Sequence, residues 1–562
     1  MLRRAGAFLL TVGIAGAAAL SEPAAATIPN DDRTIVHVLG RIAFGARPGD
    51  VDRVRAIGLQ QYIDDQLHPE RVADGDMQAR LAGLTTIGLS TEQIAAQFER
   101  PLLEMRRDRK EQAGAGNDPA ANPLSRKDRT VQQQANAVLL ELGEQKMLRA
   151  VYSDRQLQEV LTDFWFNHFN VDARKGRGRF LLTEYEREAI RPHVLGTFRD
   201  LLEATAKSPA MLFYLDNWLS ADPNGPHLEA ARRPIGRGRF LAPMPRPQAA
   251  GNNPRKGLNE NYGRELMELH TLGVDGGYTQ KDVTEVARAF TGWTIENPRA
   301  GGTFRFEPRI HDRGEKTVLG HKIQAGGGMS DGEQVLDILA AHPATAHFIS
   351  FQLARRFVSD TPPAELVDRA AARFRETRGD LREVMRAILT SPEFLGSDAR
   401  AAKVKTPFEF VVSAIRATGA DVTNALPLVR TMQELGMPLY QCQPPTGYKN
   451  TADAWVNTGA LLNRMNFGLQ LVSGGIAIRA PGAPAVGPNG QPRPQAGQRA
   501  ARAAEMGGER ARAALRQRGP IQVDIARLAP DLGETSRNAL IDSWLAADET
   551  GRELVLRLYG SA

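Results

Sequence analysis

Cysteine is almost absent from this chain, because Cys442 is the only one among 562 residues. A single thiol cannot form a disulfide within the chain, and it excludes metal sites built from several cysteines. Aromatic side chains are also scarce, at 6% of the residues, and beyond the N-terminus no apolar run reaches the about 20 residues that span a membrane. We therefore expect a soluble mature protein whose core is held by packing, in one large domain or two closely packed ones.

The short motifs of well-known enzyme classes are largely missing as well. The sequence contains no HExxH helix of zinc peptidases, and the GxSxG pattern of serine hydrolases occurs once, as GMSDG at residues 328–332. The net charge of +6 is small for a chain of this length, so it permits contact with an anionic envelope polymer but does not indicate nucleic-acid binding. These absences leave the cofactor and any metal unassigned, and whether the protein is an enzyme stays open.

Residues 1–26 have the pattern of an export signal. Arg3 and Arg4 precede an apolar run from Ala5 to Leu20, and three alanines at positions 24 to 26 form a small-residue cleavage site. We expect export by the general secretory or the twin-arginine route, followed by removal of this segment. The mature protein would then lie in the periplasm or outside the cell, without a transmembrane segment.

Apolar residues recur at helical spacing through most of the chain. In the central stretch, Leu258–Thr294, Asn259 and Thr279 are expected to cap two successive helices. Residues 303–323 have the alternation of a β-hairpin with a polar turn. The predicted fold class is therefore mainly α, with one large multi-helix domain and one minor β-hairpin.

Composition divides the chain into four parts. After the signal, residues 27–478 are predicted to form the main helical domain. Residues 479–520 are low in complexity and rich in arginine, which is typical of a flexible basic linker. Residues 521–562 contain enough Leu, Val and Trp for two or three closing helices. Within the main domain, residues 105–130 have little apolar content and are predicted to be a mobile loop.

Histidines supply the first candidates for a catalytic site. In the unusually apolar helix over residues 157–170, His168 shares one face with Phe164 and Trp165. The imidazole either belongs to a packed aromatic core or acts as a general base or metal ligand in a cleft. Both readings stay open at the level of the sequence.

The remaining catalytic candidates are His270 on the first central helix and His311 and Asp312 in the polar turn of the hairpin. Glu265 and His270 lie roughly 140° apart around a helix, on opposite flanks of its apolar stripe. A metal site on that helix alone is therefore not expected, whereas a cleft that takes His270 or Glu265 with partners from elsewhere stays open. A catalytic site would require His168, His270, His311 and Asp312 to come together from separate segments.

An irregular loop over residues 436–457 supplies candidates for ligand binding. Tyr448, Trp455 and Asn457 combine aromatic rings with an amide, the side chains that recognise sugars or peptides. Alternatively, a rigid proline-rich corner packs these rings onto the bundle. The helix that follows is predicted to bury four apolar side chains, Leu461, Leu462, Met465 and Leu469.

Several long motifs occur in one order. They are HVLGRIAFGARPGDVDRV from His37, FWFNHFNV from Phe164, NENYGRELMELHTLGVDGGYT from Asn259, HDRGEKTVLG from His311 and CQPPTGYKNTADAWVNTGALLNRMNF from Cys442. Together they resemble a large bacterial family known as domain of unknown function 1800, over roughly residues 33–475. The resemblance implies an exported, mainly helical bacterial protein, but no activity or catalytic residues. It also implies an exported sulfatase-like partner protein, because members are often encoded beside that family. A histidine often stands in the family where this chain has Phe166, so the resemblance supplies no pair of metal ligands on this helix.

Two functions of different classes follow from these observations. The first is an exported binding or assembly factor of the cell envelope, whose irregular loops contact a polymer or a partner protein. The second is an exported hydrolase, with or without a metal, built from the four His and Asp candidates. Convergence of those four side chains within proton-transfer or metal-binding distance would favour the hydrolase.

Overall fold

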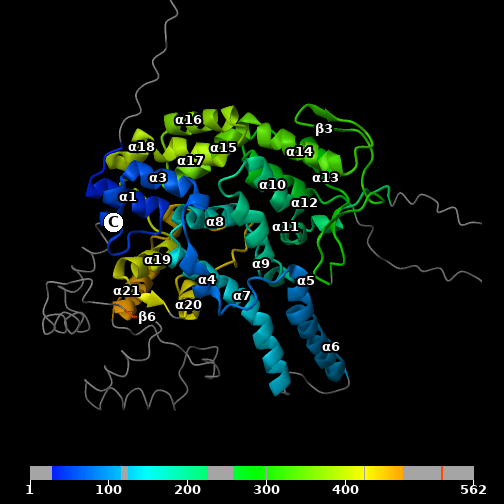
Figure 1. Cartoon of the computed structure of the whole chain (residues 1–562). Helices are drawn as coiled ribbons and strands as arrows, with labels where there is room; N and C mark the ends of the chain where they lie inside the picture. Colours follow the sequence, from blue (N-terminus) through cyan, green and yellow to red (C-terminus); the bar gives the residue numbers. More distant parts are fainter. Residues whose placement is uncertain are drawn as a thin grey trace, which may run out of the picture.

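The computed structural model describes residues 28–114, 124–225 and 257–472, apart from residues 299, 401 and 423, together with residues 521 and 522. The predicted export signal, the predicted basic linker and the C-terminal segment beyond Gln522 lie outside the described residues. The described chain is built mainly from helices with a few short strands (Figure 1). The prediction of a mainly α fold is therefore confirmed.

Helices before the central stretch form the first half of the bundle. They are α1 (Asp32–Ile42), α2 (Asp50–Ile57), α3 (Leu59–Leu67), α4 (Gly75–Leu81), α5 (Thr91–Ile94), α6 (Arg100–Gly114), α7 (Arg126–Tyr152), α8 (Gln156–His168), α9 (Leu182–Glu184), α10 (Phe198–Lys207) and α11 (Pro209–Tyr214). Helix α8 lies in the middle of the molecule and contacts α1, α3 and α7 (Figure 1). Its Trp165 is completely buried, as the apolar face of this helix predicts.

The second half of the bundle begins at the central stretch. Its helices are α12 (Glu260–Glu265), α13 (Gln280–Ala289), α14 (Met329–Ala341), α15 (Pro343–Phe357), α16 (Ala364–Glu376), α17 (Leu381–Leu389), α18 (Pro392–Leu395), α19 (Pro407–Thr418), α20 (Leu426–Glu434) and α21 (Thr458–Val472). The predicted caps are present, because Asn259 accepts from Asn261 N and Thr279 forms a reciprocal capping box with Asp282. After α12 the helix widens into one π-helical turn, η7 (Leu266–Thr271).

Helices α6 and α7 project side by side from the body of the protein (Figure 1). This pair, called the α6–α7 arm below, replaces most of the mobile loop predicted over residues 105–130; residues 115–123 lie outside the described residues. The loop prediction is wrong for these helices because Arg, Lys, Glu and Gln have good helix propensity even where nothing covers them. Ser125 also starts α7 with a capping box to Asp128. A small apolar cluster that includes Leu102 and Val138 holds the base of the arm.

The minor β part differs from the predicted single hairpin. β1 (Trp293–Ile295) pairs with β2 (Phe304–Phe306), and β3 (Lys316–Val318) pairs with β4 (His321–Ile323), both antiparallel. The predicted pairing between the second and third of these strands is wrong. Leu319 and Gly320 both have positive φ, 48° and 80°, and close a two-residue hairpin of the kind that normally uses Asn-Gly.

Helix α21 is present as predicted, but its buried face is not the predicted one. Phe467 and Leu471 are buried against the bundle, and the Phe467 ring lies 5.9 Å from that of Phe410 on α19. The four side chains predicted to be buried, Leu461, Leu462, Met465 and Leu469, are exposed. Helical spacing revealed an apolar stripe but not which side of the helix meets the bundle.

The last described strand closes a third small sheet. β5 (Asp421–Val422), between α19 and α20, pairs antiparallel with β6 (Ile521–Gln522). Within the described parts of the chain, none of the helices combines the length and apolar character that crossing a bilayer requires.

Candidate functional site

His168 ends α8 inside a ring of aromatic side chains. Its imidazole centroid lies 4.7 Å from that of Phe169, 5.4 Å from that of Trp165 and 6.2 Å from that of Phe164. Its Nε2 lies 3.1 Å from the backbone oxygen of His270, so the Nε2–H of the neutral ring donates to that carbonyl. Burial lowers the pKa of His168 to about 4, although the carbonyl contact raises it slightly.

His270 is the predicted residue that the fold brings closest to His168. It belongs to η7 and is 2% exposed, and the centroids of the two imidazoles are 6.3 Å apart. Burial, together with His168, lowers the pKa of His270 to about 3. Both rings are therefore neutral at physiological pH. No group of three or more His, Cys, Asp or Glu side chains among the described residues has a metal-binding arrangement.

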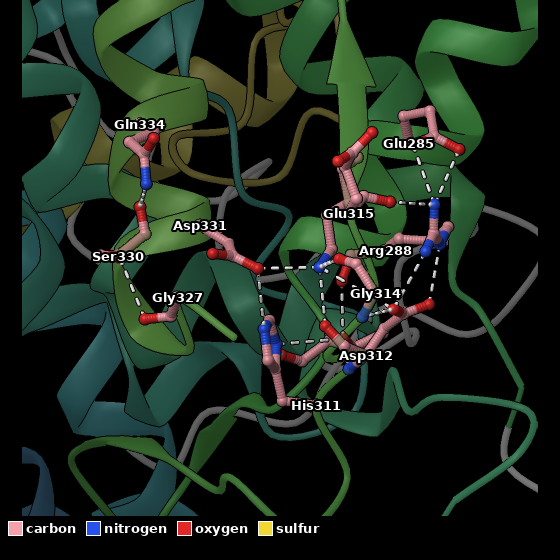
Figure 2. Close-up of polar contacts among 12 residues, drawn as sticks. Glu285, Arg288, His311, Asp312, Gly314, Glu315, Gly327, Ser330, Asp331 and Gln334 are labelled. Atoms are coloured by element: carbon pink, nitrogen blue, oxygen red, sulfur yellow. Dashed lines mark hydrogen bonds and ion pairs between the residues drawn. The ribbon is translucent and has the colours of Figure 1, made fainter. Parts of the chain in front are cut away.

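His311 and Asp312 lie in a different place, in the polar turn before β3 (Figure 2). His311 Nδ1 is 2.8 Å from the backbone oxygen of Thr291, and its Nε2 is 3.1 Å from Asp331 Oδ2. Arg288 donates two hydrogen bonds to Asp312, at 2.7 and 3.0 Å. The contacts of His311 and Asp312 are thus separate from those of His168 and His270.

Lys316 completes this polar network from the start of β3. Its Nζ lies 2.7 Å from Asp331 Oδ2, 2.6 Å from the backbone oxygen of Asp312 and 2.8 Å from that of Gly314 (Figure 2). Three acceptors match the three N–H groups of an ammonium. Burial raises the pKa of Asp331, but the hydrogen bonds from His311 and Lys316 outweigh it, so that the pKa is lowered. The network stabilises the turn.

Sequence reasoning identified His311 and Asp312 but missed Lys316 and Asp331. Lys316 stands within the motif HDRGEKTVLG, so its place beside Asp312 could have been noticed. Asp331 comes from α14 across two strands and a loop, and no local pattern links it to His311.

In the loop over residues 436–457, the polar atoms of the Tyr448 and Trp455 rings bond within the loop itself. The Tyr448 hydroxyl donates to the Pro438 carbonyl at 2.8 Å, and Trp455 Nε1 donates to the Lys449 carbonyl at 2.8 Å. Asn457 is exposed and accepts a hydrogen bond from Ala460 N at the start of α21. Trp455 is buried, so these contacts agree with the packed-corner alternative.

A cavity of about 20 Å³ lies between α8, α15, α19 and this loop. Its lining is mostly polar: Asp163, Phe164, Asn167, Arg356, Thr406, Glu409, Met437, Tyr448, Lys449 and Asn450. Arg356 Nη2 contacts Glu409 Oε1 at 2.7 Å on the cavity wall. The cavity therefore brings together side chains from four segments that are far apart in the sequence.

The cavity lining itself has two acidic and two basic side chains, but basic side chains outnumber acidic ones in the surroundings of Glu409 on its wall. Six basic residues lie within electrostatic reach of two carboxylates: Arg41, Arg355, Arg356, Lys403, Lys405 and Arg464 beside Glu409 and Asp360. The cavity and these eight residues are called the cationic pocket below. Its surplus of four positive charges is partly buried. Burial lowers the pKa of Arg41 to about 10 and also lowers that of Lys405.

One of three comparisons with known proteins finds a match. The comparisons with curated proteins and with solved structures find none. A family model described as "Protein of unknown function (DUF1800)" matches residues 37–553. The match extends beyond the motifs, which end near residue 475, into the C-terminal segment. Because it covers nearly the whole chain, the protein belongs to the DUF1800 family.

Proposed function

We propose that this protein is an exported binding or assembly factor of the cell envelope that binds an anionic group in the cationic pocket. The observation that carries the proposal is the surplus of positive charge around Glu409, on the wall of this cavity. Removing a charged group from water is costly unless an opposite charge accompanies it. A bound phosphate, sulfate or carboxylate would supply that charge through charge-assisted hydrogen bonds.

Lys405 shows why the pocket favours an anion. Its Nζ lies 2.7 Å from Ser413 Oγ, a neutral oxygen that balances no charge. Attraction to Glu409 raises its pKa, but burial and repulsion by Arg41 lower it. An anion beside Lys405 would therefore favour its ammonium form.

The envelope location rests on the pattern of residues 1–26, which favours export into the periplasm or beyond. Envelope polymers that carry phosphate, sulfate or carboxylate are ligands of the required class. An exported sulfatase-like protein, which the family resemblance implies as a partner, would act on the same anionic class. The mild positive net charge of +6 agrees with such a ligand.

The substitution Lys405→Met tests this proposal. We expect the mature protein to bind poly(glycerol phosphate), but not neutral dextran, in calorimetry at low salt. Lys405→Met should weaken that binding roughly tenfold or more, since a hydrogen bond to a charged group contributes about 1.5–3 kcal/mol. It should leave the melting temperature unchanged or raise it, because a buried, unbalanced cation is removed.

Lys322→Met is the matched control, because Lys322 is an exposed lysine on β4. This control should bind the polymer as the unsubstituted protein does. Failure of the unsubstituted protein to bind any anionic polymer, or equal binding by Lys405→Met, would contradict the proposal.

The exported hydrolase is the second candidate, because the fold does bring His168 and His270 together. Their neutral, aromatic surroundings favour a structural role, and His168→Ala distinguishes the two. In a structural role this change leaves the His270 carbonyl without its donor and costs roughly 1–3 kcal/mol of unfolding free energy. Binding of zinc, measured by calorimetry on the folded protein, should be unaffected. Stoichiometric zinc binding that His168→Ala abolishes would instead support the hydrolase.

A further inference from the structure

The apolar stripe of α21 is an exposed surface that the proposed function does not use. Leu461, Leu462, Met465 and Leu469 are 61%, 56%, 36% and 40% exposed. At about 100° per residue they fall within one sector roughly 100° wide, which is called the α21 face below. A contiguous exposed apolar patch of this kind normally marks a contact surface.

The last described strand anchors the C-terminal segment on the two helices against which α21 packs. β6 (Ile521–Gln522) pairs with β5 at the connection between α19 and α20. Helix α21 packs on the same two helices, toward their other ends: Asn463 Nδ2 donates to the carbonyl of Glu434 at the end of α20, and Phe467 contacts Phe410 near the start of α19. Residues from 523 onward therefore begin on the same pair of helices as α21.

The sequence of this segment carries a matching apolar pattern. Leu540, Ile541, Trp544 and Leu545 follow the spacing i, i+1, i+4, i+5, which is typical of one helix face. The family match extends to residue 553, so one family model covers both the bundle and most of the segment. A segment that shares a family model with the bundle is expected to pack against it.

We propose that residues 523–558 dock this apolar pattern onto the α21 face of the same chain. The β5–β6 pairing tethers the segment, which gives it a high effective concentration at the face. A second copy or a partner protein lacks this tether. Docking removes both apolar surfaces from water, which is the main driving force for such contacts.

Photo-cross-linking on the full mature chain tests the docking. A benzophenone amino acid at position 462 should cross-link to peptides from residues 523–558 within a monomer, as identified by mass spectrometry. The same amino acid at position 103 is the control, because Leu103 is also exposed, at 47%, but lies on the α6–α7 arm. That control should give no cross-link to the segment.

A second substitution makes the result specific. With the cross-linker at position 462, Trp544→Asp should reduce the yield roughly tenfold or more, because a charge replaces a large apolar side chain. Circular dichroism should show an unchanged fold. Cross-links that connect two chains, cross-links only to other parts of the bundle, or no cross-link at position 462 would each overturn the proposal.

Discussion

Acidification below pH 6.5 is expected to remove several kcal/mol of the stability of this protein. His37, His168 and His270 have pKa values lowered from 6.5 to about 4, 4 and 3, chiefly by burial. Below pH 6.5 the unfolded chain therefore binds more protons than the folded chain. The stability that comes from keeping these three histidines neutral is fully present above pH 6.5, and it is lost as the pH falls toward their folded-state pKa values. At 1.36 kcal/mol per pKa unit, each histidine accounts for roughly 2 kcal/mol of this loss by about pH 4.5.

Urea unfolding at neutral pH and at about pH 4.5 measures this loss. Carboxylates with lowered pKa values, such as Asp331, act in the same direction at lower pH, so a variant must isolate the histidines. His168→Phe should reduce the loss by roughly 2 kcal/mol. His347→Gln should not change it, because that side chain is 60% exposed. Equal pH dependence in both variants would show that His168 is not held neutral.

Replacing Lys316 by Met is expected to lower the free energy of unfolding by about 3–5 kcal/mol, because it breaks a buried ion pair and leaves one partner charged. Asp331, which is completely buried, would keep its contact with His311 but lose Lys316, the only lysine paired with it among the described residues. Two backbone carbonyls would lose their donor as well. The change can be measured by urea unfolding at neutral pH.

Lys322 offers the comparison within the same hairpin. It is 57% exposed and pairs with Glu315 at 2.8 Å, and exposed pairs of this kind contribute about 0–1 kcal/mol. Lys322→Met should therefore cost less than about 1 kcal/mol. If the two lysine variants lost the same stability, the network around Lys316 would not be what stabilises the turn.

Features set by neighbouring residues could be predicted from the sequence. The caps at Asn259 and Thr279 depend on side chains within three positions, and both are present. The apolar face of α8 likewise follows from its own periodicity. The hairpin pairing failed because Leu319 adopts a positive φ, which a branched apolar residue rarely does.

Features that depend on distant residues could not be predicted. His168 and His270 are 102 positions apart; the first resembled a histidine on an apolar face, and the second lay on the flank of an apolar stripe. The cationic pocket combines side chains from α1, α15, α19 and α21. No local sequence pattern indicates that these basic residues lie together near only a few carboxylates. Periodicity also revealed the apolar stripe of α21 without indicating what covers it.

The α6–α7 arm has a consequence for how the protein moves in solution. A helix rises about 1.5 Å per residue, so the 27 residues of α7 extend over roughly 40 Å, and part of that length stands clear of the body (Figure 1). The arm adds little mass but increases the longest dimension of the particle, which raises its rotational friction. The protein should therefore tumble more slowly, and elute earlier in size exclusion, than a sphere of its mass. In the envelope location proposed above, the arm would also slow diffusion through narrow pores.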